Sequence, residues 1–331
     1  MFKGRAWKAV SFGDPADVVR LQEVSWPDPE PGRVLVRVRT AGAGRPDLLM
    51  ARGQFRLAGD PPVALGEEVA GDVVAVPPGS GFAVGEKIMG ITDFLRGWGG
   101  YADYAYVREQ SAARVPSCLS DEQAGGFPIG FRTAYAGLVE RAPLAAGQVL
   151  LVLGAAGSAG SAAVQLGQAL GATVLAVVGS PEKAAFAVRS GADHAVNYKT
   201  ADLPRAIAAL TDGHGVDLVY DTVGGALAGT AIRALARNGR IAIVGLASGA
   251  TVQLNSYDML ARNYSAVGVL ASGYAPEEDA AAWGVLAGLA SRGAIATPVG
   301  TVYDFGGIPS MIREQSAPPP GKSVVRVWGI A

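Results

Sequence analysis

The chain has 331 residues, of which 50% are hydrophobic and 17% are charged, and its formal net charge is −1. This length fits about two domains, and the composition supports a large buried core rather than disorder. Because the chain is nearly neutral, it lacks the basic surface that binds nucleic acid. No apolar run reaches the roughly 18 residues that span a membrane, and the start, MFKGRAWKAV, lacks an apolar signal core.

The few cysteines and histidines restrict disulfide and metal chemistry. The single cysteine, Cys118, excludes an internal disulfide, fits a reducing cytoplasm, and is interpreted as a buried apolar side chain. With only His194 and His214 beside it, neither a four-cysteine nor a three-histidine zinc site can form. Both histidines lie in turn sequences, GADH and DGHG, where surface or turn-capping roles are expected. We therefore expect a cytoplasmic protein without a metal ion.

The first third of the chain has the pattern of a small β-barrel. Short β-branched runs are separated by glycine and proline, and in residues 34–39 valine alternates with leucine and arginine. Short strands with turn signals between them predict a barrel. The expected strands are residues 5–12, 17–26, 32–42, 68–76, 85–91 and 100–107.

The pattern changes near Ser120, which Glu122 and Gln123 follow, as expected for a helix N-cap with acidic and polar residues in the first turn. Residues 120–142 are predicted to be helical with a break at Phe127-Pro128. Strands and helices then alternate, which predicts a parallel sheet with right-handed crossovers. The expected strands are 148–154, 173–180, 194–198, 215–223, 240–246 and 264–272, and the expected helices are 158–171, 181–191, 203–211 and 227–239.

The last part of the chain returns to the first domain. A helix is expected over 277–293, followed by the segment GIPSMIREQ and a strand over 323–330. The chain is therefore predicted to be an α/β protein of two domains. A β domain comprises 1–120 and 271–331, and a doubly wound parallel-sheet domain comprises 121–270.

The turn after the strand at 148–154 has the features of a dinucleotide-binding loop. Residues 150–160, LLVLGAAGSAG, run from a buried strand through small residues into a helix. Small residues let the backbone approach a pyrophosphate, which the free N–H groups of the helix N-terminus attract. The spacing here is G-x-x-G-x-x-G instead of G-x-G-x-x-G, and an ordinary tight turn is the alternative.

The end of the next strand distinguishes NADPH from NADH. NADH sites usually carry an acidic residue there to bind the ribose 2′-hydroxyl. This chain has Gly179-Ser180, and Lys183 follows in the helix. A serine hydroxyl and a cation favour a 2′-phosphate, and therefore NADPH, although Lys183 could also be a solvated helix lysine.

These segments together resemble the zinc-independent quinone oxidoreductase (zeta-crystallin-like) branch of the medium-chain dehydrogenase/reductase superfamily. The matching pieces include GRVLVRVRTAGAGRPDLLMARGQF, ALGEEVAGDVVAV, GFRTAYAGL and LGAAGSAGSAAVQLGQALGATVLAVVGSPEK, and the resemblance covers nearly the whole chain. It implies a GroES-like β-barrel domain, a Rossmann domain and NADPH in the cleft between them. It also implies a homodimer that pairs through the edge strand YSAVGVLAS.

The resemblance also implies which residues bind the cofactor. They fall in the pyrophosphate turn, at the 2′-phosphate site, beside the adenosine phosphate, and in the loops near the nicotinamide. These positions are Thr133, Ala156, Gly157, Ser158, Ala159, Gly160, Gly179, Ser180, Lys183, Tyr198, Val223, Gly245, Leu246, Ala247, Val269 and Leu270.

The zinc-dependent members of the superfamily differ at two decisive positions. Their catalytic cysteine would fall at Gly44 and their zinc histidine at Glu67, and the lobe of four structural cysteines is missing here. Zinc-free relatives commonly carry asparagine at the Gly44 position, so substrate orientation is expected to differ in this chain. The substrate contacts that we predict are Gly44, Arg45, Phe55, Phe94, Trp98 and Tyr274. Packing in the core is the alternative for the aromatic ones.

The predicted reaction is hydride transfer from NADPH to a small quinone or conjugated carbonyl compound, which needs no serine–histidine–aspartate set. Tyr101, Tyr104 and Tyr135 are possible proton donors, each with a structural role as the alternative, and no catalytic acid is assigned. Two other functions stay open: an enoyl-thioester reductase, and a non-catalytic regulator that binds NADPH.

Overall fold

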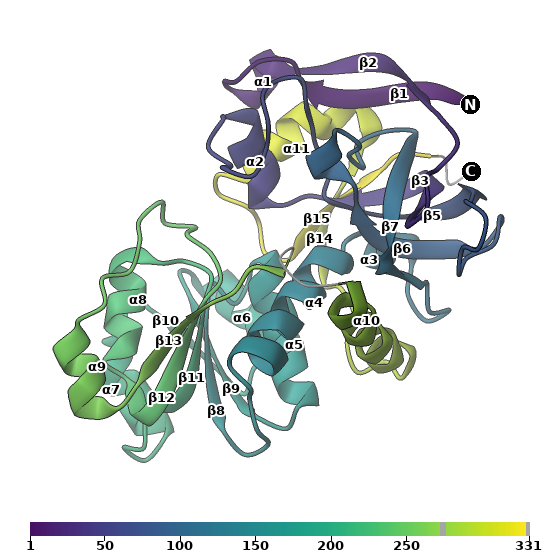
Figure 1. The fold of residues 1–331 in the computed structure, drawn as a ribbon. Helices are drawn as coiled ribbons and strands as arrows, with labels where there is room; N and C mark the ends of the chain where they lie inside the picture. Colours follow the sequence, from purple (N-terminus) through teal and green to yellow (C-terminus); the bar gives the residue numbers. More distant parts are fainter. Residues whose placement is uncertain (272–275, 329–331) are drawn as a thin grey trace. The chain divides into compact units, whose positions relative to one another are not determined.

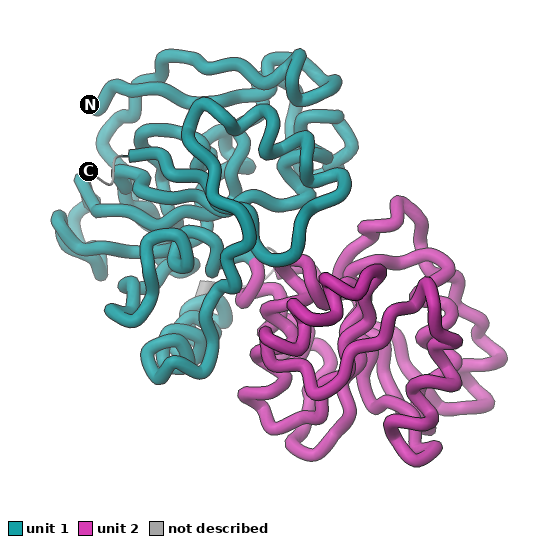
Figure 2. The backbone as a smooth tube through the Cα atoms, turned by 180° about the vertical axis from the view of Figure 1, so that it is seen from behind, with its two compact units in different colours: residues 1–129, 274–331 teal, residues 130–273 magenta. Residues whose placement is uncertain are grey.

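A computed structural model of the chain describes residues 1–271 and 276–328. The chain forms two compact units, shown in Figures 1 and 2. Unit 1 comprises residues 1–129 and 274–331, and unit 2 comprises residues 130–273. Unit 2 is therefore continuous in sequence, whereas unit 1 is completed by a second segment at the end of the chain.

The centre of unit 1 is the predicted small barrel. Six strands follow the order β14-β15-β3-β5-β6-β7, and β7 also pairs with β3, so four strands close on themselves. Strand β3 therefore pairs with three strands, β5, β7 and β15. The strands are β3 (Arg33–Gly42), β5 (Glu68–Ala75), β6 (Lys87–Thr92), β7 (Tyr104–Arg114), β14 (Val299–Asp304) and β15 (Lys322–Arg326).

A second, three-stranded sheet and several helices complete unit 1. The sheet has the order β2-β1-β4, and its Trp26 packs with Leu35 and Tyr106 of the barrel in one buried cluster. Helix α10 packs against β7, and α11 packs against α1 and α2. These elements are β1 (Phe2–Ala9), β2 (Val19–Trp26), β4 (Val63–Ala64), α1 (Pro15–Val18), α2 (Arg45–Ala51), α3 (Asp121–Gly125), α10 (Pro276–Ser291), η4 (Phe305–Gly307) and α11 (Ile308–Glu314).

Unit 2 contains the predicted parallel sheet, with the strand order β10-β9-β8-β11-β12-β13. Helices α5 and α6 lie on one face of the sheet, and α7, α8 and α9 lie on the other (Figure 1). The first strand, β8, lies in the middle of the sheet. The chain adds β9 and β10 on one side of it and then β11, β12 and β13 on the other, so the sheet is doubly wound. The strands are β8 (Val149–Leu153), β9 (Thr173–Val178), β10 (His194–Asn197), β11 (Val216–Asp221), β12 (Leu235–Ile243) and β13 (Ser265–Gly268).

Several helices begin at a side chain that caps their first amides. Asp202 caps α7, Asn255 caps α9, and Ser120 of the preceding unit caps α3 by accepting from the Gln123 amide at 3.2 Å. The helices are α4 (Pro128–Tyr135), a π-helix (Ala136–Arg141), α5 (Ser158–Ala169), α6 (Pro181–Arg189), α7 (Leu203–Leu210), α8 (Gly225–Ile232) and α9 (Ser256–Arg262). Within the described residues, none of the helices is long and apolar enough to cross a membrane.

Two expectations from the sequence are wrong. The helix predicted over 227–239 ends at Ile232, and β12 begins at Leu235, which pairs with Val216 of β11 before a bulge. The helix ends early because Leu235 is buried and paired in the sheet, which outweighs the helical pattern of the sequence. Asn238, with φ 65°, turns the chain within the bulge. Cys118 is exposed instead of buried, because it lies in the loop before α3.

Candidate functional site

The glycine-rich turn of unit 2 joins β8 to α5 as the sequence predicts. Gly154 has φ +71°, a conformation that side chains rarely adopt, and Gly157 is the N-cap residue of α5. A Cβ atom at Gly160 would lie 2.2 Å from the Gly154 carbonyl oxygen. The helix therefore packs against the turn so closely that only glycine fits at Gly160.

The start of α5 presents three amide groups without partners. The first helical hydrogen bond runs from the Ser161 amide to the Gly157 carbonyl oxygen, at 2.8 Å. The N–H groups of Ser158, Ala159 and Gly160 have no acceptor in the part of the chain that the structure describes. Three free N–H groups at the positive end of a helix dipole can bind an anion.

Two further loops of the sheet lie beside this turn. The Thr222 hydroxyl donates to the Leu153 carbonyl oxygen at 2.8 Å, and Val223 lies 3.1 Å from where a Cβ atom of Gly154 would be. The loop after β12 lies against Thr222, because the Ala247 amide donates to the Thr222 carbonyl oxygen at 3.1 Å. The predicted cofactor residues that the structure brings together here are Ala156, Gly157, Ser158, Ala159, Gly160, Val223, Gly245, Leu246 and Ala247.

The remaining predicted cofactor residues near the nicotinamide come from β13 and α4. Val269 follows β13, is buried, and donates its amide to the Ile243 carbonyl oxygen at 3.0 Å, whereas Leu270 is exposed. Thr133 lies half-buried in α4, whose Gly130 approaches the first turn of α5 at Ser158. All of these positions belong to unit 2.

The end of β9 contains the predicted 2′-phosphate residues, and the structure adds one. Ser180 is the N-cap of α6, and its hydroxyl oxygen accepts from the Lys183 amide at 3.2 Å, so its proton stays available for a ligand. Tyr198 follows β10, and its ring lies 3.3 Å from where a Cβ of Gly179 would be. The Lys199 side chain lies 3.4 Å from the same point. Sequence reasoning missed Lys199, although the parallel pairing of β9 with β10 could have indicated it.

In unit 1 the predicted residue Gly44 lies beside a buried cluster of acidic side chains. Asp47 accepts from the amides of Gly44 at 2.9 Å and of Gly66 at 2.8 Å, and from the Tyr101 hydroxyl at 2.8 Å. Burial raises the pKa of Asp47, while these three donors lower it. Tyr101 therefore binds Asp47, and burial, followed by the charge of Asp47, raises its own pKa well above the ordinary value.

Two glutamates extend this cluster, which we call the acid cluster and define as Asp47, Glu67 and Glu68. Glu68 forms an ion pair with Lys322, in which both side chains are 2% exposed, and accepts from the Ile129 amide at 2.7 Å. Glu67 is 7% exposed. Burial raises its pKa well above the ordinary value, the charges of Asp47 and Glu68 raise it further, and Lys322 lowers it. Sequence reasoning missed the acid cluster, because Asp47 and the adjacent pair Glu67 and Glu68 lie on different elements, and Lys322 follows much later in the chain.

The other predicted substrate contacts are scattered over unit 1. Arg45 opens α2, Phe55 is half-buried in the loop after α2, and Phe94 is 7% exposed in a short helix, η1 (Phe94–Arg96). Trp98 packs edge-on against Tyr106, with ring centroids 5.0 Å apart. Tyr274 lies outside the described residues. Which of these residues contact a substrate therefore stays a prediction.

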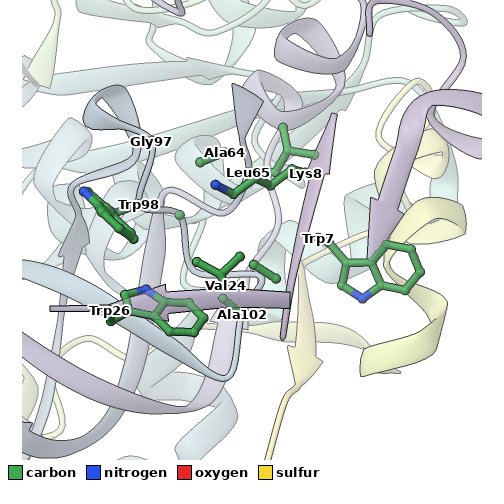
Figure 3. A pocket seen from close by; sticks show the side chains of 11 residues that line it. Trp7, Lys8, Val24, Trp26, Ala64, Leu65, Gly97, Trp98 and Ala102 are labelled. Atoms are coloured by element: carbon green, nitrogen blue, oxygen red, sulfur yellow. The ribbon is translucent and has the colours of Figure 1, made fainter. Parts of the chain in front are cut away.

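Trp98 also lines a small pocket in unit 1, together with Lys8, Trp26 and Leu65 (Figure 3). The pocket has room for about one water molecule. A quinone ring cannot enter such a space. This pocket is therefore not the substrate site in the conformation described.

Known proteins share both the sequence and the architecture of this chain. Residues 30–117 match the alcohol dehydrogenase GroES-like domain, and residues 159–287 match the domain described as zinc-binding dehydrogenase. The quinone oxidoreductase-like protein 2 of Bos taurus is 31% identical over 268 residues, which cover 80% of this chain and 76% of that protein. The chain belongs to the quinone oxidoreductase branch of the medium-chain dehydrogenase/reductase superfamily.

Solved structures of this branch have the same architecture. The Escherichia coli quinone oxidoreductase complexed with NADPH is 26% identical, with a TM-score of 0.87, over 98% of this chain and 100% of that one. A mycobacterial protein complexed with NADPH is 25% identical, with a TM-score of 0.88, over the same shares. The predicted fold class, a GroES-like barrel with a Rossmann domain, is thereby confirmed.

A zinc ion, as in a zinc-binding dehydrogenase domain, would need side chains that are free to bind it. Asp47 is bound by two amides and a hydroxyl, and Glu68 is bound by Lys322. Within residues 1–271 and 276–328, no group of three His, Cys, Asp or Glu side chains could hold a metal ion. The residues of this family member therefore do not fit zinc at the acid cluster.

Proposed function

We propose that this chain is an NADPH-dependent, zinc-free oxidoreductase that transfers hydride to a quinone or an α,β-unsaturated carbonyl compound. The observation that carries the proposal is the pair of anion sites in unit 2. Free amides start α5, and Gly179 stands in place of an acidic residue at the end of β9. Ser180 caps α6 there, Lys183 follows in the first turn of this helix, and the Lys199 side chain lies beside Gly179. Pyrophosphate and 2′-phosphate are the two anionic groups of NADPH that such sites bind.

The residues of unit 2 fit this cofactor. The amides of residues 158–160 would bind the pyrophosphate, and Ser180 with Lys183 would bind the 2′-phosphate. The ring of Tyr198 would lie beside the adenosine phosphate, and Thr133 with the loops after β11, β12 and β13 would position the nicotinamide half. Bound NADPH supplies the hydride, and the protein positions the acceptor and shields it from water.

A titration and a substrate panel test the proposal. Protein fluorescence should show tight binding of NADPH and clearly weaker binding of NADH. Oxidation of NADPH should then follow addition of a naphthoquinone or a 2-alkenal. Turnover with crotonyl-CoA alone would favour the enoyl-thioester reductase, and tight binding without any turnover would favour the non-catalytic regulator. Absence of NADPH binding would refute the proposal.

Quaternary structure, location and domain boundaries belong to the same proposal. We propose a homodimer through β13, because this strand ends the sheet of unit 2 and leaves one edge unpaired. Light scattering should give twice the chain mass of 33.7 kDa, and a monomeric mass at micromolar concentration would refute the dimer. We also propose a cytoplasmic location, from the single cysteine, and functional domains of 1–120 with 271–331 and of 121–270.

A further inference from the structure

Asp221 is a buried carboxyl residue at the carboxyl end of β11, and its side chain binds the loop that follows. Its Oδ1 atom accepts from the amides of Val223 and Gly224, each at 2.8 Å. Its Oδ2 atom has no hydrogen-bond partner among the described residues, and the whole residue is 0% exposed. Burial of a carboxyl group costs free energy, so its presence calls for a function in this loop.

The loop that Asp221 binds has a backbone conformation that needs support. Gly224 has φ +73° and ψ −164°, a region that is essentially restricted to glycine. It lies close to the loop after β12, because a Cβ atom at Gly224 would be 2.5 Å from the Ala250 carbonyl oxygen. The Ser248 amide of that loop donates to the Val223 carbonyl oxygen at 2.9 Å. Such conformations persist only where the surroundings fix them, and they are common at ligand sites.

The backbone at Asp221 also joins this loop to its two neighbours. The Asp221 carbonyl oxygen accepts from the amides of Val244 at 2.8 Å and of Gly245 at 3.1 Å, which follow β12. The Thr222 hydroxyl donates to the Leu153 carbonyl oxygen, where the glycine-rich turn begins. Asp221 therefore lies where the loops after β8, β11 and β12 meet.

The strand order places these loops beside the nicotinamide half of a bound dinucleotide. Along the strands β9-β8-β11-β12, the proposed 2′-phosphate site is at the end of β9, and the proposed pyrophosphate site is at the end of β8. A cofactor that continues in the same direction along this edge of the sheet reaches β11 and β12 with its other half. Open α/β sheets bind ligands at such a point, where the strand order reverses.

Building on the proposed function, we propose that Asp221 is a positioning residue for the nicotinamide half of NADPH. Its carboxyl group holds Val223 and Gly224 in the conformation that receives this half, while the 2′-phosphate site at β9 binds independently. The role depends on one oxygen that accepts from two amides. An asparagine side chain has the same oxygen, so the charge of Asp221 is not needed.

The test measures the affinities of Asp221→Ala and Asp221→Asn for two ligands by calorimetric titration. One is NADPH, and the other is adenosine 2′,5′-bisphosphate, which has the 2′-phosphate but no nicotinamide. We expect Asp221→Ala to bind NADPH at least about tenfold more weakly than the wild type, because two loop residues must then be ordered on binding. Its affinity for the bisphosphate should stay within about twofold of wild type, and Asp221→Asn should bind NADPH within about threefold of wild type.

Asp217→Ala is the matched control. Asp217 lies near the other end of β11, and its carboxylate accepts from the Val149 amide at 2.8 Å. Loss of this hydrogen bond should lower the melting temperature, whereas the affinities for both ligands should not change.

Gly224→Ala is a second variant, which also serves if Asp221→Ala fails to fold. It displaces the same loop while Asp221 stays in place, because its Cβ atom would meet the Ala250 carbonyl oxygen. It should therefore weaken the binding of NADPH and leave the binding of the bisphosphate unchanged. Equal effects on the two ligands would contradict the inference.

Amide hydrogen exchange reports on the loop without any ligand. The amides of Val223 and Gly224 should exchange at least about tenfold faster in Asp221→Ala than in the wild type or in Asp221→Asn. Unchanged exchange in Asp221→Ala, or an equal loss of affinity for NADPH and for the bisphosphate, would overturn the inference. So would an NADPH affinity of Asp221→Asn as low as that of Asp221→Ala.

The same titrations separate this inference from the proposed function. If the wild type binds neither NADPH nor the bisphosphate, the proposed function fails, and this inference, which rests on it, fails as well. If the wild type binds NADPH and Asp221→Ala binds it equally well, only this inference fails.

Discussion

The two lysines at the end of β9 offer a quantitative test of cofactor recognition. Lys183 is half-buried in the first turn of α6, and Lys199 is exposed just after β10. A hydrogen bond to a charged group that is partly shielded from water contributes about 1.5–3 kcal/mol. An exposed ion pair contributes only about 0.2–1 kcal/mol.

These magnitudes predict different effects for the two substitutions. Since 1.4 kcal/mol corresponds to a factor of ten, Lys183→Ala should raise the Kd for NADPH by about 10- to 100-fold. Lys199→Ala should raise it by at most about fivefold. Neither change should alter the Kd for NADH by more than about twofold, because NADH has no 2′-phosphate for a lysine to bind.

The assay is fluorescence titration of each variant with both dinucleotides at low and high salt. Arg189→Ala is the control, because it removes one positive charge from the last turn of the same helix. Equal losses of NADPH and NADH affinity in Lys183→Ala would refute the reasoning. So would an equal loss of NADPH affinity in Arg189→Ala, which would indicate a general effect of net charge.

Three further substitutions test packing and protonation. Gly160→Ala places a Cβ atom 2.2 Å from a carbonyl oxygen of the preceding turn, so it should lower the free energy of unfolding by about 1–3 kcal/mol and weaken NADPH binding. Gly229→Ala, at a position where space is open, should do neither. Calorimetry measures the stability of both variants, and titration measures their NADPH affinity. Glu67 keeps its proton in the folded protein above the pH at which the unfolded chain loses it, so stability falls as pH rises from about 4.3 toward the raised pKa. The gain in Tm of Glu67→Gln over the wild type should therefore be larger at pH 8 than at pH 5, and an equal gain would contradict the raised pKa. Tyr101→Phe removes a buried donor from a carboxylate and should lower the free energy of unfolding by about 1–3 kcal/mol, while Tyr104→Phe should change it little in the same denaturant titration.

The features that local sequence determines were predictable. The strand, glycine turn and helix around Gly157 follow each other directly, so their residue types reveal the close packing of backbone on backbone. The cap at Ser120 is equally local, because donor and acceptor are three residues apart. In contrast, the helix predicted to reach 239 ended early, because pairing of Leu235 with β11 is a contact that periodicity does not show.

The site residues that were missed all depend on contacts between distant segments. Lys199 reaches Gly179 only through the pairing of β10 with β9. The acid cluster brings Asp47 of α2 and the two glutamates at the start of β5 together with Lys322 of β15, more than 200 residues later in the chain. In the sequence LGEE, two adjacent glutamates resemble an ordinary solvated pair, and burial alone gives them their chemistry.

The interrupted course of unit 1 has a consequence for how the protein is made. Residue 129 ends its first segment, and β15 leaves the ribosome roughly 200 residues later, after all of unit 2. At about 5–20 residues per second, the growing chain lacks β15 for roughly 10–40 s. During this interval the Glu68 carboxylate has no lysine to neutralise it, and residues 40–42 of β3 lack their pairing with β15. Unit 2 can meanwhile fold on its own contacts, so a nascent chain stalled before residue 322 should expose the unpaired end of β3, which chaperones can bind.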